Sequence, residues 1–473
     1  MRYLIPCFLL CALVPGSAWA DADLSSPATA TTAAAAEPFA FGDFTWVPGN
    51  SRTHLSPLTG PAFVGEFRID APWHYNANAP VDHTISGSSE VFRHGELQVT
   101  QIGAGGDFHY GNAHGRLMTQ FGMYSETTAR NDASAARGQW QLDNAYRYVS
   151  EAYGGYHFDV LNGINIQAVI FMSYIGLWSY YNADNWTYQP SYVSSNTPWF
   201  FNGVRAQIFL TDKLKIEPWL VNGWQSYGTF NNSPGGGGQI LWRPTSYLSF
   251  VSNNYYGADT LGNPDRKRWH TDDSMMVKYY ENKGGFISKA AMSLTVDAGC
   301  ETGGGVSCMN GTAAAPSQYF VGFMAYNRLW FNNDHFGLTL GGGAIKNPGR
   351  YLVLVPPING ATAYSGVSPN IKNPDGSTAF SANPGDPFTA WDTQVTFDWM
   401  PVEFVTFRLE YNHRAASIPY FSGHGGVTPP NGSGSYVNQG SAGSEVKNPD
   451  GTSWMPDLSK TEDRATLALM LKL

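Results

Sequence analysis

Apolar and polar residues alternate along most of this chain in runs of roughly ten residues. The C-terminal run is the clearest, because every second residue from Leu467 to Leu473 is a leucine, while Thr466, Met470 and Lys472 take the other face. Successive side chains of a β-strand point to opposite faces, and a tilted strand of about 9–11 residues crosses a bilayer. The pattern predicts an all-β fold, a transmembrane antiparallel β-barrel.

The links between these runs alternate between short and long. The short links lie at about 111–114, 159–163, 211–213, 243–246, 281–285, 332–335 and 400–403. The long links lie at about 71–95, 125–147, 175–198, 222–238, 256–269, 297–317, 344–390 and 413–463. These links predict about 16 strands, with a range of 14 to 18 because glycine-rich runs are weakly marked. Short links are periplasmic turns and long links are extracellular loops in such barrels.

The first sixty residues precede the predicted barrel. Residues 1–20 combine one basic residue, an apolar run and Ala18-Trp19-Ala20, which is the pattern of a cleaved secretory signal peptide. Residues 21–36 contain no aromatic residue and almost no bulky apolar one, so burial there cannot offset the entropy of ordering. We expect a flexible periplasmic segment over 21–60 and the barrel over 61–473.

Composition favours a membrane barrel over a soluble β-sandwich, which also alternates. Aromatic and charged residues each make up 14% of the chain, and 52 residues are glycine. Aromatic girdles at two membrane interfaces explain this balance. The longest apolar run of the mature chain, 168–178, is too short for a helical span. The net charge of −9 is spread thinly and no basic run favours nucleic acid.

The mature chain contains two cysteines, Cys300 and Cys308, in a polar, glycine-rich stretch. An exported protein matures where thiols oxidise, so we expect a local disulfide that stabilises by roughly 2 to 3 kcal/mol. A metal site is the alternative, but no second Cys or His pair has ligand spacing. No cofactor motif is found in the sequence.

Six aromatic and glycine-rich segments together resemble the OmpL-like β-barrel porin family of Gram-negative outer membranes. The segments are Phe41–Trp46, Gly105–Tyr110, Glu151–Phe158, Gln189–Tyr192, Lys215–Trp219 and Val221–Trp224. The likeness runs from about residue 38 to the C-terminus. It implies an outer-membrane barrel of porin type. One departure is the final Leu473, where assembly signals of such barrels commonly end in an aromatic residue.

Charged and amide side chains oppose the apolar face of several predicted strands. A barrel of this size can leave an aqueous channel, so the inward positions are candidates to line a pore for small hydrophilic solutes. Because both signs of charge occur, we expect weak ion selectivity. The pore-lining candidates are Arg205, Gln207, Lys215, Glu217, Asp398, Arg408, Glu410 and Lys472.

The third long link, 175–198, is rich in aromatic residues and is the candidate constriction loop. Aromatic rings stack on sugar faces, so this loop could guide sugars. The simpler interpretation is a loop that packs on itself or a membrane girdle. Its aromatic residues are Trp178, Tyr180, Tyr181, Trp186, Tyr188 and Tyr192.

Two other classes of function stay open at this point. A surface adhesin or receptor would use the long stretches 344–390 and 413–463 and tolerate a closed lumen. An outer-membrane enzyme would need a nucleophile beside a base such as His109 or His413, yet no Gly-x-Ser-x-Gly elbow occurs. The expected partners of the porin are outer-membrane lipid and solute, and a homotrimer is one candidate assembly.

Overall fold

The computed structural model describes residues 37–54, 56–134, 138–311, 317–348, 388–428, 448–452 and 456–473. The predicted signal peptide, 1–20, and the start of the segment 21–60 lie outside the described residues. Much of the predicted extracellular stretches 344–390 and 413–463 also lies outside them. Among the described residues, no helix is long and apolar enough to cross a membrane.

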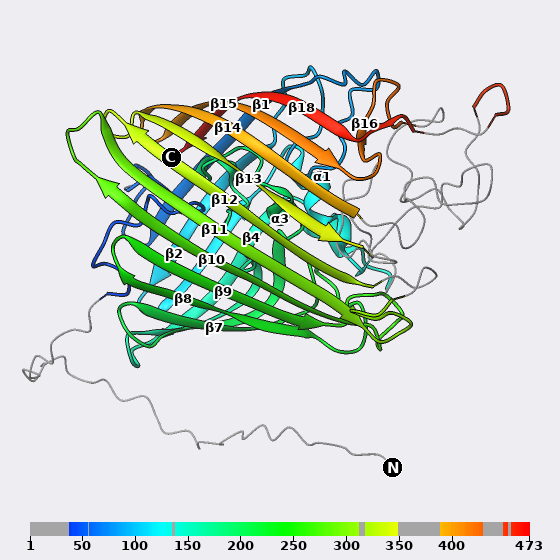
Figure 1. The fold of residues 1–473 in the computed structure, drawn as a ribbon. Coiled ribbons are helices and arrows are strands. Elements are labelled where there is room, and N and C mark those ends of the chain that lie inside the picture. Colours follow the sequence, from blue (N-terminus) through cyan, green and yellow to red (C-terminus); the bar gives the residue numbers. More distant parts are fainter. Residues whose placement is uncertain are drawn as a thin grey trace, which may run out of the picture. The chain divides into compact units, whose positions relative to one another are not determined.

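Sixteen antiparallel strands form one closed barrel, as Figure 1 shows. Each strand pairs with its neighbours in sequence, and β1 closes the ring against β18. The strands are β1 (Phe63–Asn76), β2 (Gln101–Tyr110), β3 (Ala113–Thr119), β4 (Val149–Phe158), β5 (Ile164–Met172), β6 (Phe200–Phe209), β7 (Leu214–Val221), β8 (Gly235–Thr245), β9 (Leu248–Gly257), β10 (Lys267–Glu281), β11 (Ile287–Thr302), β12 (Tyr319–Phe331), β13 (Phe336–Asn347), β14 (Phe388–Val402), β15 (Val405–Ala416) and β18 (Thr461–Lys472).

Short elements lie in the loops. A two-stranded sheet pairs β16 with β17. These elements are α1 (Tyr124–Thr127), η1 (Thr128–Asn131), α2 (Leu142–Tyr146), η3 (Asn182–Asp184), α3 (Tyr192–Ser195), β16 (Phe421–Ser422) and β17 (Leu458–Ser459). The prediction of a sixteen-strand barrel with alternating short turns and long loops is confirmed.

The boundary of β1 differs from the predicted one. The sequence predicts a loop from residue 71, where Pro72 follows, but the strand continues to Asn76. Beyond Asp70, β1 pairs with β18 on one edge, while on the other edge it meets the β1–β2 loop in place of β2. There the Gln98 N–H donates to the Pro72 carbonyl oxygen at 2.9 Å, and Trp73 forms an isolated bridge with Leu97. Proline lacks a backbone N–H and is tolerated where the neighbouring segment is irregular and not a central strand, so Pro72 does not end β1.

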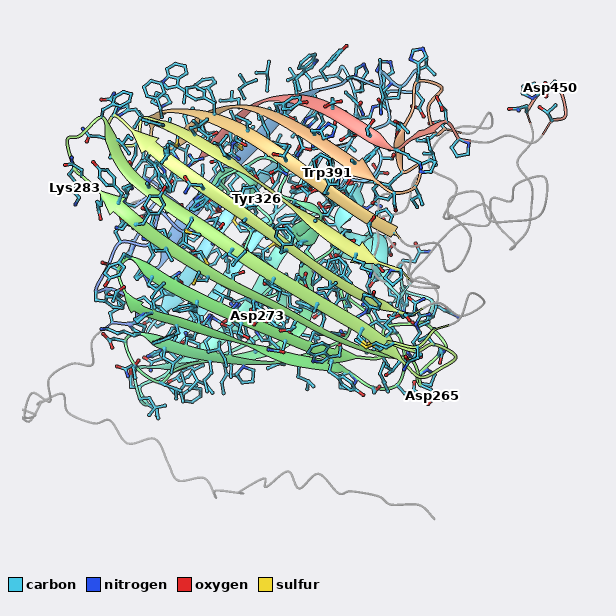
Figure 2. The ribbon with its side chains drawn as sticks, viewed as in Figure 1. Asp265, Asp273, Lys283, Tyr326, Trp391 and Asp450 are labelled. Atoms are coloured by element: carbon cyan, nitrogen blue, oxygen red, sulfur yellow. A yellow bond between two sulfur atoms is a disulfide. The ribbon has the colours of Figure 1, made fainter. Side chains whose placement is uncertain are left out.

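The barrel wall turns its apolar face outward and its polar face inward. On β14, Trp391, Val395 and Phe397 are exposed, while Gln394 and Asp398 are buried. Figure 2 shows the side chains on the strands, with Trp391 on β14 and Tyr326 on β12 labelled. A soluble sandwich would bury the apolar face instead. The arrangement fits a barrel wall surrounded by lipid.

Two segments fill the inside of the barrel. The inner loop, residues 173–199, joins β5 to β6, and the N-terminal strap, residues 37–54, precedes β1. Both contribute buried aromatic side chains to one core cluster, including Trp46 of the strap and Trp178 and Trp186 of the inner loop. For residues 37–54 the structure thus differs from the expected flexible segment, because these residues pack against the inner wall.

Candidate solute pathway

The inner loop packs tightly inside the barrel. All six of its predicted aromatic residues are 7% exposed or less. Trp178 packs edge-to-face on Tyr326 of β12, with ring centroids 4.8 Å apart, and Trp186 packs in the same way on Trp330. The Tyr180 hydroxyl donates to Gln120, and Arg414 lies 4.0 Å from the Tyr192 ring. These rings hold the loop in place.

Arg408 on β15 fixes the middle of the inner loop. Its guanidinium donates to the carbonyl oxygens of Asn182 and Asn185, at 3.2 and 2.6 Å. The same group pairs with Asp398 on β14 at 2.7 Å. Arg328 on β12 also reaches Asp398, at 2.8 Å. Two candidate pore-lining residues, Asp398 and Arg408, are therefore buried beneath the loop, where they act as a clamp.

Glu410, two residues further along β15, holds the next part of the loop. Its carboxylate accepts hydrogen bonds from the backbone N–H groups of Tyr188 and Gln189, at 2.6 and 3.1 Å. Hydrogen bonds to a charged group are worth about twice a neutral one. Lys472 on β18 lies 3.4 Å from Asp184 of the same loop. Four of the eight candidates thus meet around the inner loop.

The other four candidates form a separate cluster on β6 and β7. Arg205 and Lys215 both pair with Glu217, and Gln207 donates to the same carboxylate at 3.3 Å. Arg205 also lies 4.4 Å from the Phe171 ring. The structure places all eight candidates on the inner face, as the alternation predicts, but it divides them between two groups of strands.

The N-terminal strap crosses the periplasmic end of the barrel between two sets of short turns. At one end, the Phe39 N–H donates to Asp212 in the β6–β7 turn at 2.8 Å. At the other end, Arg52 donates to the carbonyl oxygens of Val402 and Val405 beside the β14–β15 turn, at 3.0 and 2.6 Å. Trp46, at the centre, is 0% exposed. The strap therefore covers part of the periplasmic opening.

The strap touches the inner loop directly. The Trp186 indole N–H donates to the Trp46 carbonyl oxygen at 3.1 Å, and the Gly49 N–H donates to Asp184 at 3.0 Å. Gly49 has a φ of 87°, and a Cβ there would lie 2.5 Å from the Leu177 carbonyl oxygen. Only glycine permits this close approach without strain. The strap and the inner loop thus form one layer.

A cavity of about 890 Å³ remains between this layer and the wall formed by β1–β5. It is bounded by the strap, the inner loop and the strands, and it extends to Met172 at the loop end of β5. Of the six loop aromatics, Tyr181 lines it. Phe44 of the strap and Tyr153 of β4 supply two further rings.

The cavity wall carries a network of paired charges. Arg116 on β3 donates to Glu151, Asp107 and Glu66, at 2.9, 2.8 and 3.0 Å. Arg68 bridges Glu66 to Asp184 of the inner loop, which Lys472 also approaches. The lining carboxylates outnumber the lining Arg and Lys side chains: they are Asp43, Glu66, Asp107, Glu151 and Asp184, against Arg68, Arg116 and Lys472.

A second cavity, of about 420 Å³, lies on the other side of the strap. His54 and Glu403 line it, with a 3.2 Å contact between them. Burial acts to raise the pKa of Glu403, but the hydrogen bonds from His54 outweigh it and the pKa lies below its ordinary value. The strap therefore separates two water-accessible spaces at the periplasmic end.

At the extracellular end, Asp82 of the β1–β2 loop joins the loop that follows β15. Its carboxylate accepts from the Thr428 hydroxyl and from the N–H groups of Val427 and Thr428, each at 2.7 Å. Burial acts to raise the pKa of Asp82, but these hydrogen bonds and one from Thr84 outweigh it and lower the pKa. We call this contact the Asp82 latch.

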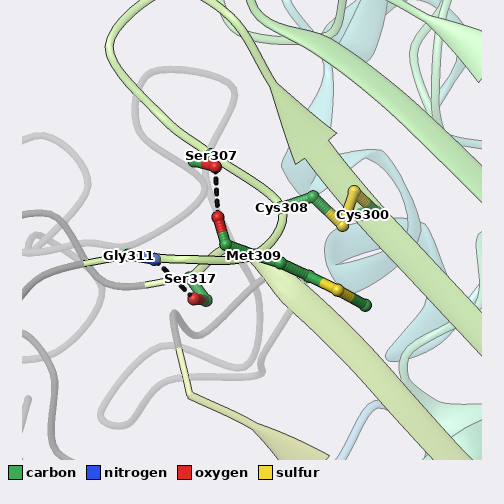
Figure 3. The surroundings of a disulfide bond; sticks show 6 residues. All are labelled: Cys300, Ser307, Cys308, Met309, Gly311 and Ser317. Carbon is green, nitrogen blue, oxygen red and sulfur yellow. Dashed lines mark hydrogen bonds between the residues drawn. A yellow bond between two sulfur atoms is a disulfide. The ribbon is translucent and has the colours of Figure 1, made fainter.

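The structure joins Cys300 to Cys308 by a disulfide, as Figure 3 shows. Cys300 lies near the end of β11 and Cys308 lies in the following extracellular loop. The Ser307 hydroxyl and the Met309 carbonyl hydrogen-bond beside the bridge. The disulfide therefore closes the start of this loop. Within the part of the chain that the structure describes, no group of His, Cys, Asp and Glu could hold a metal ion.

Residues 68–439 match the model of a family described as "Putative beta-barrel porin-2, OmpL-like". The chain belongs to this family. The match covers more than half of the sequence and confirms the resemblance seen in the six aromatic and glycine-rich segments. It gives the OmpL-like chain an outer-membrane location and the passage of small solutes as its function.

Solved structures of outer-membrane channels are similar to this OmpL-like chain. DcaP of Acinetobacter baumannii shows 11% identity over 90% of this chain and 100% of that chain, with a TM-score of 0.47. OprB of Pseudomonas putida shows 9% identity over 87% and 94%, with a TM-score of 0.44. OprD of Pseudomonas aeruginosa shows 9% identity over 90% and 99%, with a TM-score of 0.38. None of the curated proteins matches the chain.

Sequence reasoning missed the strap and the Arg116 network. Residues 39–47 are dense in aromatic side chains directly after an alanine-rich stretch, which is the signal that could have separated the strap from residues 21–36. Arg116, Glu66 and Glu151 lie on three different strands, so no spacing in the sequence connects them. Strand pairing brings them together.

Proposed function

We propose that small hydrophilic solutes cross the barrel through the 890 Å³ cavity, between the β1–β5 wall on one side and the inner loop and strap on the other. The observation that carries this proposal is the charged lining of the cavity, beside a core of buried aromatic side chains from the inner loop and the wall. Charged side chains let water and hydrated solutes pass where apolar walls would exclude them.

The excess of carboxylates gives this route a weak preference for cations over anions. Each lining arginine is already paired with at least two carboxylates, so the surplus charge is negative. On the strand wall, Asp107 presents more surface to a solute than Glu151 does, because its side chain is 51% exposed while that of Glu151 is 10% exposed. Salt screens such exposed charges over about 8–10 Å, which keeps the preference modest.

Sugars are a candidate class of solute for the same route. Tyr153 and Tyr181 flank the cavity, and aromatic rings stack on the apolar faces of sugars. All six predicted loop aromatics are engaged in packing, and Tyr181, which lines the cavity, is 6% exposed with the Arg68 guanidinium 3.9 Å from its ring, so a sugar path would rely chiefly on Tyr153.

Single-channel conductance of the refolded full chain in a planar bilayer tests the proposal. We expect discrete open steps, and a change in step size when Tyr181→Ala widens the cavity. The matched control is Trp391→Ala, which alters a ring on the outer face of β14. A barrel that inserts and passes neither ions nor sugars would exclude this route.

A closed surface adhesin or receptor is the second candidate. The Asp82 latch favours it, since the latch holds two loops together over the extracellular end. The bilayer experiment separates the two functions, because a closed adhesin would show no conductance.

For the enzyme alternative, the His413 ring lies 2.8 Å from the carboxylate of Asp463 on β18. If the barrels assemble as a homotrimer, each barrel would conduct through its own cavity.

A further inference from the structure

The outer face of β8–β10 carries polar and small residues in the middle of the lipid-facing wall. Asp273 lies near the centre of β10, between Trp269 toward the extracellular loops and Tyr279 toward the periplasmic turns, and all three side chains are exposed. Figure 2 labels Asp273 on this wall. A carboxylate between two aromatic girdle positions lies at the level of the hydrocarbon core, where charge is costly.

The neighbours of Asp273 toward β9 and β8 are also unsuited to lipid, whereas Val296 of β11, on its other side, is apolar and exposed. Strand pairing sets Ser252 of β9 beside Asp273, and Asn254 beside Thr271. Gly238 of β8 lies on the far side of Asn254, and Pro218 of β7 lies beyond it. We call the surface formed by Gly238, Ser252, Asn254, Thr271 and Asp273 the polar patch.

The opposite wall shows what a lipid-facing row looks like in this barrel. Strand pairing aligns a row across β13, β14, β15, β18 and β1 in which every outward residue is large and apolar. The row consists of Leu338, Phe397, Leu409, Leu467 and Trp73. The polar patch is therefore a local departure from the pattern of the wall.

The patch carries both a hydrogen-bond acceptor and a donor. The Asp273 carboxylate accepts from the Thr271 hydroxyl at 3.0 Å, which leaves most of its capacity unused. The Asn254 side-chain amide makes no hydrogen bond to any residue that the structure describes, and it is exposed. Gly238 leaves room beside them for close approach of another backbone.

We propose that the polar patch is the contact surface between two copies of this chain, related by a two-fold axis along the membrane normal. In such a pair, the Asp273 carboxylate of each copy accepts a hydrogen bond from the Asn254 amide of the other copy. An isologous interface requires a self-complementary surface, and the patch supplies both halves of each hydrogen bond.

The inclination of the strands supports this pairing. In Figure 1 the strands slope between the turns and the loops, and β9 follows β10 around the wall. Because of this slope, a residue of β9 lies nearer the periplasmic turns than the β10 residue with which it pairs, so Ser252 lies nearer the turns than Asp273. Asn254 lies two residues further along β9, toward the extracellular loops. Asp273 and Asn254 therefore lie at similar levels along the barrel axis, as a two-fold axis parallel to it requires.

Photo-crosslinking in the intact outer membrane tests the proposal. A photoreactive phenylalanine derivative replaces Ser252 in the full chain, and the matched control carries it in place of Phe397 on the apolar row. We expect an adduct of twice the chain mass from position 252 and none from 397. Lipid adducts alone at 252, or an adduct with a different protein, would overturn the assignment to a second copy.

A second experiment uses the double variant Asn254→Leu with Asp273→Leu. Native mass spectrometry in mild detergent should show the wild-type pair reduced at least tenfold in favour of single barrels. Heat-modifiable migration on gels reports that the variant barrel is folded. A folded variant that retains the wild-type mass distribution would contradict the proposal, as would a wild-type protein that is a single barrel or a homotrimer.

Discussion

The indole N–H of Trp186 donates a 3.1 Å hydrogen bond to the backbone carbonyl oxygen of Trp46. This bond joins the centre of the inner loop to the centre of the N-terminal strap, two segments 140 residues apart in the chain. Both tryptophans are buried, at 0% and 3% exposure for Trp46 and Trp186. The residual cavity lies beside this contact, so the two segments together set how much of the lumen stays open.

Trp46→Ala should release the centre of the strap and enlarge the opening. We expect single-channel conductance to rise by about twofold or more, because current through a pore increases with its open cross-section. The barrel itself should keep its thermal stability, since its strands do not depend on the strap for pairing. Phe41→Ala, at a strap residue that is 39% exposed, is the control. Equal conductance in wild type and Trp46→Ala would show that the strap does not narrow the path.

Arg408→Met should destabilise the barrel and loosen the inner loop. The variant leaves Asp398 with Arg328 as its remaining cation and removes both hydrogen bonds to the loop backbone. Breaking a buried ion pair costs about 3–5 kcal/mol. Urea unfolding followed by tryptophan fluorescence measures this change.

Arg93→Met is the matched control for the clamp, because Arg93 pairs with Glu96 on an exposed loop. Exposed pairs contribute about 0–1 kcal/mol. If both variants lose the same free energy of unfolding, Arg408 does not have the special role assigned to it.

Asp107→Asn should reduce the preference for cations. Removing one charge beside the path changes the local potential by about 1 kcal/mol before screening, so the permeability ratio of potassium to chloride should fall by about twofold. Lys472→Met removes a positive charge from the same cavity and should shift the ratio in the opposite direction. Reversal potentials in a KCl gradient report both. Shifts of the same sign in the two variants would argue against an electrostatic origin.

The Asp82 latch should open in acid. Its folded pKa lies below the ordinary value of 3.8, so the latch contributes stability above that value and loses it as the pH falls through the folded pKa. We expect the β1–β2 loop to become sensitive to an acid-active protease below about pH 3.8 in wild type. In Asp82→Asn the carboxylate is absent, so the loop should be sensitive at every pH tested. A loop whose cleavage rate is independent of pH in wild type would refute the latch.

The wall of the barrel could be predicted from the sequence because the alternation of apolar and polar residues within each strand determines which side chains face lipid. Every second residue of β14 or β15 faces lipid, and the alternation survives even where boundaries shift. The strand boundary at β1 differs because Pro72 meets the irregular β1–β2 loop at Gln98 and not a β2 strand, a contact that the neighbouring residues in the chain do not reveal. Inward candidates such as Arg205 and Glu410 follow from the same alternation.

The contents of the barrel could not be predicted in this way. The inner loop and the strap have no repeating pattern, and their positions depend on contacts such as Glu410 to the Tyr188 N–H, more than two hundred residues away in sequence. The pattern places Arg408 on the inner face but does not show that a loop covers it. Asp273 could have been noticed, since the alternation of β10 already turns it toward lipid.

Thiol accessibility tests the central claim, the position of the path, most directly. Outside the predicted signal peptide, the sequence has no cysteine other than Cys300 and Cys308, which are joined, so single cysteines can be introduced cleanly. A charged methanethiosulfonate reagent should reduce the conductance of Asp107→Cys, whose side chain lines the cavity, and leave Ser293→Cys on the opposite inner wall unchanged. Block at position 293 with none at 107 would place the path elsewhere and contradict the account.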